Sequence, residues 1–70
     1  PDSAEGEDKE RESAAIALDA MRRAIEAGES ADALNKLNRI LCNEHNVRVY
    51  PKKDGSLMVA NKKGDVIMEG

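Results

Sequence analysis

Residues 46–69 read NVRVYPKKDGSLMVANKKGDVIME, and this stretch decides the fold. Over 47–50, 56–60 and 65–68 the residues follow the two-residue period of short β-strands. The segments between these runs, 51–55 and 61–64, each end in glycine, as a type I turn followed by a glycine bulge requires. The stretch therefore predicts a three-stranded antiparallel meander.

The loop lengths also predict the register of this sheet. Three-residue loops at 53–55 and 62–64 place Val49 opposite Val59, and Val59 opposite Ile67. One face then carries the residues on which the helices are expected to pack: Val47, Val49, Leu57, Val59 and Ile67. The other face carries Tyr50, Met58, Ala60, Val66 and Met68, with Arg48 among them. A solvated sheet face is normally polar, so this second apolar face predicts a contact surface. A slip of one residue in the second turn would exchange Val66 and Met68 with Ile67 and leave the face apolar.

Upstream of the strands the apolar residues recur with the helical period. A first helix is predicted from a start between residues 8 and 13 to Ala27, with Gly28 as a left-handed stop. A second is predicted from the N-cap Ser30 to about His45, with Asn46 in the left-handed conformation. The short link between them favours an antiparallel hairpin. The predicted fold class is α+β, in the order ααβββ, with the helical hairpin on one face of the meander.

The length and composition predict one small domain. Residues 8–70 form that domain, whereas residues 1–7 are acidic and aperiodic and are expected to be a disordered arm. The aromatic inventory is one tyrosine, and the single cysteine permits no disulfide within the chain. Such a small core favours a shared, dimeric one, and a lone thiol is typical of a reducing, cytoplasmic compartment.

Two surfaces are expected to bind a partner. The first predicted helix has an apolar arc wider than one small sheet requires, and its alanine side allows another helix to approach. Methionine-rich faces suit adaptable protein recognition. The predicted partner-binding residues on these two surfaces are Ala17, Ala20, Ala24, Tyr50, Met58 and Met68. The alternative for the alanine side is that it simply covers the sheet.

Cys42 and His45 stand one helical turn apart, so they are candidates for metal ligands and for a nucleophile with its base. A structural zinc site needs four ligands, and the chain has no second cysteine or histidine. No serine elbow or phosphate-binding glycine loop is present. We therefore expect no metal, no cofactor and no enzymatic activity. A zinc site shared between two copies is the remaining alternative.

Paired lysines in the two turns suggest a second kind of partner. They would act with a strand arginine, and the set is Arg48, Lys52, Lys53, Lys62 and Lys63. Lysines on exposed turns can contact phosphates, although they also occur as ordinary solvated turn residues. Successive turns of a meander lie at opposite ends of the sheet, roughly 17 Å apart. The second predicted helix could be tested as a recognition helix, with outward polar residues Asn35, Lys36, Asn38, Arg39 and Asn43.

The sequence thus favours a non-enzymatic protein–protein interaction module: an adaptor, inhibitor or regulatory subunit that is homodimeric and cytoplasmic. The formal net charge of −3 argues against bulk nucleic-acid binding, so a nucleic-acid-binding regulator is the alternative. No apolar run is long enough to cross a membrane.

Overall fold

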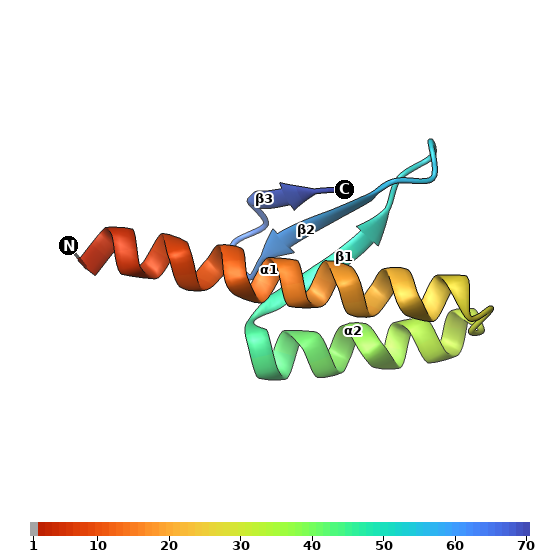
Figure 1. Cartoon of the computed structure of the whole chain (residues 1–70). Coiled ribbons are helices and arrows are strands. Elements are labelled where there is room, and N and C mark those ends of the chain that lie inside the picture. Colours follow the sequence, from red (N-terminus) through yellow and green to blue (C-terminus); the bar gives the residue numbers. More distant parts are fainter. Residues whose placement is uncertain (1) are drawn as a thin grey trace.

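The chain folds as two helices followed by a three-stranded antiparallel sheet, which confirms the predicted order ααβββ (Figure 1). The computed structural model describes residues 2–70, with side chains from residue 8 onwards. The elements are α1 (Asp2–Glu26), α2 (Ala31–His45), β1 (Val47–Pro51), β2 (Leu57–Asn61) and β3 (Val66–Glu69). In the sheet, β2 lies between β1 and β3.

Helix α1 begins at Asp2, earlier than the predicted start between residues 8 and 13. Acidic residues near a helix start interact favourably with its dipole, and glutamate and alanine are good helix formers, so the composition of this segment is compatible with helix. Its first turns extend beyond the strands in Figure 1. Of the predicted arm, Pro1 and the side chains of residues 2–7 lie outside the described residues. That residues 1–7 are separate from the domain stays a prediction.

Helix α1 covers the sheet. It contacts all three strands, whereas α2 lies beside α1 and contacts only β1 among the strands. The small side chains of Ala14 and Ala17 are completely buried, so the backbone of α1 can approach the sheet closely. Valines at 47, 49 and 59 fill the space beneath it. The core is therefore built from alanine, valine and leucine side chains together with Met21.

The predicted ends of α2 are confirmed. The hydroxyl of Ser30 accepts a hydrogen bond from the Ala33 N–H at 3.2 Å. Asn46 has the left-handed φ of 60° and donates its N–H to the carbonyl of Cys42 at 3.1 Å. Gly28, with φ of 77°, ends the turn after α1 as expected. Because Asn46 alone separates α2 from β1, the strand turns back directly beside the end of the helix.

The register between β2 and β3 differs from the prediction, whereas that between β1 and β2 agrees. Val49 pairs with Val59 as predicted, but Val59 pairs with Met68 rather than Ile67. The register shifts between Val59 and Ala60, so Ile67 is the extra residue of a β-bulge. Ile67 and Met68 both pack against the core, and the placement of Met68 on the other face was wrong.

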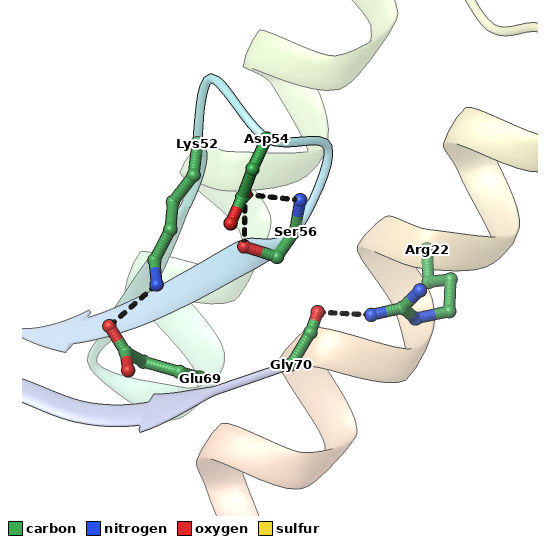
Figure 2. A network of polar contacts seen from close by, with 6 residues as sticks. All are labelled: Arg22, Lys52, Asp54, Ser56, Glu69 and Gly70. Atoms are coloured by element: carbon green, nitrogen blue, oxygen red, sulfur yellow. Dashed lines mark hydrogen bonds and ion pairs between the residues drawn. The ribbon is translucent and has the colours of Figure 1, made fainter.

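Both ends of β3 are fixed, and this accounts for the bulge. At one end the Asn61 side-chain oxygen accepts from the N–H groups of Lys63 and Asp65, each at 3.0 Å. At the other end Leu57 and Gly70 exchange two backbone hydrogen bonds of 3.1 and 2.8 Å. The Arg22 guanidinium also donates to the Gly70 carbonyl (Figure 2). Between these two anchors, β3 has one residue more than a regular antiparallel ladder with β2 would pair, and this extra residue forms the bulge.

Asn38 joins α2 to the free edge of β1. Its side-chain NH₂ donates to the Val49 carbonyl and its oxygen accepts from the Val49 N–H, both at 2.9 Å. Asn38 is therefore half-buried against the strand and does not point outward as predicted. Two residues further along, Pro51 has no N–H to offer. This edge of the sheet is blocked against pairing with another strand.

Neither helix in the described residues 2–70 is long and apolar enough to span a lipid bilayer.

Candidate functional site

The candidate site lies on the outer face of the sheet, the face opposite α1. Two cross-strand rows of side chains build it. Paired positions share a face, so Arg48, Ala60 and Val66 form one row and Tyr50, Met58 and Glu69 form the next. Within these rows Tyr50 and Val66 are 40% and 51% exposed to solvent. A mostly apolar face is thus left without a covering layer within the described chain.

This face is hollowed where the first row meets the end of α2. We call this depression of about 490 Å³ the outer hollow. Its apolar surface comes mainly from the strands, and its polar rim comes from the end of α2 and the β2–β3 turn. The lining residues are Cys42, Asn46, Val47, Arg48, Tyr50, Met58, Ala60, Asn61, Lys62, Gly64 and Val66.

Arg48 is the central charged group of the outer hollow. Interaction with the Cys42 side chain, and next with that of Tyr50, raises the pKa of Arg48 above its ordinary value. These two neighbours come from α2 and from β1 itself, so the guanidinium lies near the junction of helix and strand. Arginine is always protonated in proteins and presents five N–H donors. Arg48 therefore offers a permanent positive charge and several N–H groups that a ligand can accept from.

The charge around the outer hollow changes sign over a short distance. Among the side chains that the structure describes, Arg48 and Lys62 are the charged ones that line it, and both are cations. On the helix-facing side of the sheet, which Asn61 shares with its partner Val47, the Glu10 carboxylate accepts a hydrogen bond from the Asn61 side-chain NH₂ at 3.5 Å. On the other side, Glu69 pairs with Lys52 at 2.8 Å, an interaction that raises the pKa of Lys52 (Figure 2). On the outer face, Glu69 therefore borders the cations of the hollow towards the β1–β2 turn, while the exposed Lys63 extends the positive charge along the β2–β3 turn.

The structure brings together some of the predicted site residues and separates others. Tyr50, Met58, Arg48 and Lys62 meet in the outer hollow. Lys52 and Lys53 lie on the β1–β2 turn, at the other end of the strands from Lys62 and Lys63, as the meander geometry predicted. The two lysine pairs do not form one surface.

The predicted helical contact residues have three different environments. Ala17 is fully buried on the face of α1 that packs on the core, so it has no surface with which to contact a partner. Ala20 is half-buried against the core, and Ala24 is also half-buried. The alanine side of α1 thus serves the protein's own core to a large extent, which was the alternative considered for it. Met68, in the core, is likewise absent from the outer hollow.

Five lining residues were not placed in this site by sequence reasoning: Cys42, Asn46, Val47, Asn61 and Gly64. Cys42 lines the outer hollow, whereas His45 lines a separate depression of about 200 Å³ beside Lys9, Glu10 and Ser13. The thiol and imidazole therefore do not face a common site for nucleophile and base. Among the residues with described side chains, no group of three or more His, Cys, Asp or Glu could hold a metal ion. The one-residue link at Asn46 was the signal that the end of α2 would reach the sheet.

A scan against protein-family models finds no match to this chain, and searches of curated proteins and of solved structures find no similar protein.

Proposed function

We propose that this chain is a non-enzymatic protein–protein interaction module whose outer sheet face binds a partner. The observation that carries the proposal is the outer hollow, in which Tyr50, Met58 and Val66 present apolar surface on the side of the sheet away from the helices. Because α1 covers the opposite face of the sheet, this face is available to another molecule. The module acts in the cytoplasm as an adaptor, inhibitor or regulatory subunit and uses no cofactor.

The proposal also includes self-association through the helical hairpin. Ile40 on α2 is 49% exposed, and on α1 Ile25 and Ile16 are 42% and 46% exposed on opposite sides of that helix. Burial of such side chains is worth about 1.5–3 kcal/mol each when complete. Sedimentation equilibrium is expected to show a dimer that Ile40→Glu dissociates and Met58→Glu does not. A single 7.6 kDa species at high micromolar concentration would contradict the dimer.

The test of partner binding compares surface variants in a pull-down from native lysate, with and without nuclease. A protein partner should be retained after nuclease treatment by wild type and by Lys53→Ala, an exposed lysine outside the outer hollow. Tyr50→Ala and Met58→Ala should lose the same partner, because they remove the aromatic and the thioether surface of the hollow. Equal capture by all four proteins would contradict binding at this face.

The alternative is a nucleic-acid-binding regulator that uses Arg48 and the lysine turns. Counterion release would make such binding fall steeply with salt. Replacing Lys52, Lys53, Lys62 and Lys63 with alanine should then abolish it and reduce the salt slope. The engagement of Lys52 with Glu69 and the separation of the lysine pairs favour the protein partner. Micromolar, salt-sensitive binding to generic DNA or RNA that the quadruple variant loses would reverse this ranking.

A further inference from the structure

We infer that the outer hollow binds a short peptide segment of the partner in which a bulky apolar side chain stands beside one or two carboxylates. This inference rests on the proposed function and adds the chemistry of the ligand. It follows from three features of the hollow: its apolar surface, the sign of its charges and the limits of its positive region.

The apolar surface provides a seat for one large side chain. Met58 and Ala60 lie on the central strand, flanked by Tyr50 on β1 and Val66 on β3. Methionine adapts to differently shaped apolar groups, and the tyrosine ring offers a flat surface against which an aliphatic or aromatic side chain packs. The depression of about 490 Å³ is large enough for such a side chain together with adjoining backbone.

The charges of the hollow select an anion. Arg48 and Lys62 line it without any carboxylate, in a chain whose net charge is −3. They come from β1 and from the β2–β3 turn, so they flank the apolar surface on two sides. A guanidinium binds a carboxylate through two parallel N–H···O bonds, whereas an ammonium acts as a point charge. One carboxylate beside the apolar anchor would bind Arg48, and the same or a second carboxylate would interact with Lys62.

The limits of the positive region favour a peptide over a nucleic acid. On the outer face, Glu69 occupies the next cross-strand row, where it pairs with Lys52. A polyanion with evenly spaced phosphates that crosses this row would pass from the cations of the hollow to the Glu69 carboxylate, where like charges repel. One or two carboxylates fit within the hollow without reaching Glu69. Tyr50 is also the only Phe, Tyr or Trp residue in the chain, so successive bases have no row of such rings on which to stack.

The experiment is a selection from a phage-displayed library of random peptides on the immobilised full chain. Enriched peptides should combine Asp or Glu with a neighbouring Leu, Ile, Met, Phe or Trp. A fluorescein-labelled copy of the best peptide is then titrated by fluorescence polarisation. Arg48→Glu and Tyr50→Ala should each weaken binding by about tenfold or more. Lys53→Glu makes a comparable charge change on the opposite turn and should leave binding nearly unchanged, and circular dichroism checks that each variant is folded.

The other outcomes separate the inference from the proposed function. Enrichment of neutral or basic apolar peptides that need Tyr50 would overturn the acidic ligand and leave the interaction module standing. Enrichment of no peptide, or of peptides that bind Tyr50→Ala and Arg48→Glu as well as wild type, would overturn both. Tight binding of labelled single-stranded DNA that Arg48→Glu abolishes would overturn the inference in favour of a nucleic-acid ligand.

Discussion

Asn38→Ala tests how much the contact between α2 and β1 contributes to stability. The substitution removes the two 2.9 Å hydrogen bonds to the Val49 backbone, and Val49 is completely buried. Each such hydrogen bond contributes about 0.5–1.5 kcal/mol net. We therefore expect a loss of about 2 kcal/mol, which corresponds to a fall of about 8–16 °C in Tm for a domain of this size.

The matched control is Asn35→Ala on the exposed side of the same helix. Both variants gain the same helix propensity of about half a kcal/mol, so their difference isolates the hydrogen bonds. Chemical denaturation followed by circular dichroism gives the two free energies of unfolding. Asn38→Asp keeps an acceptor for the Val49 N–H but turns an oxygen towards the Val49 carbonyl, and it should also destabilise the protein. A difference below about 0.5 kcal/mol between Asn38→Ala and Asn35→Ala would refute the reasoning.

Three further predictions concern local features. Hydrogen bonds from the Ser56 hydroxyl, and next from its N–H, lower the pKa of Asp54. They therefore stabilise the fold at pH values above the ordinary pKa of a carboxyl group. This contribution to stability is lost as the pH falls through the lowered pKa. Ser56→Ala should raise that pKa in an NMR titration of the Asp54 carboxyl carbon; an unchanged midpoint would contradict this. Gly64→Ala should cost about 1–2 kcal/mol in denaturant, because φ is 93° while no atom obstructs a Cβ, and an unaltered midpoint would show that the turn tolerates alanine. Deleting residues 1–7 should change the free energy of unfolding by no more than about 0.5 kcal/mol, whereas a drop of several degrees in Tm would show that they contribute to folding.

The features that the sequence predicted correctly depend on local chemistry. Ser30 caps a helix with its own hydroxyl, and Gly28, Gly55 and Gly64 adopt the positive φ that their turns need. These interactions join residues only a few positions apart, so they can be recognised in the sequence alone. The order of elements followed from them, because short links leave little choice of topology.

The features that the sequence missed depend on contacts between distant residues. The bulge at Ile67 results from two anchors, the Asn61 turn and the pairing of Leu57 with Gly70, neither of which alone disturbs the register. Periodicity likewise could not show that Asn38 turns towards Val49. Part of the outer hollow was predicted from the sequence, because the two-residue period of the strands places Tyr50 and Met58 on one face. Cys42 was missed, because only the packing of α2 against β1 brings it to the rim.

The position of Tyr50 has a consequence for optical work on this protein. It is the sole intrinsic fluorophore of the usual kind, since the chain has no tryptophan and no phenylalanine. Its ring is part of the outer hollow and is 40% exposed, rather than buried in the core. Tyrosine emission should therefore follow occupancy of the outer hollow more closely than it follows unfolding. A ligand without aromatic groups can be titrated against the unlabelled protein, with Tyr50 as the reporter.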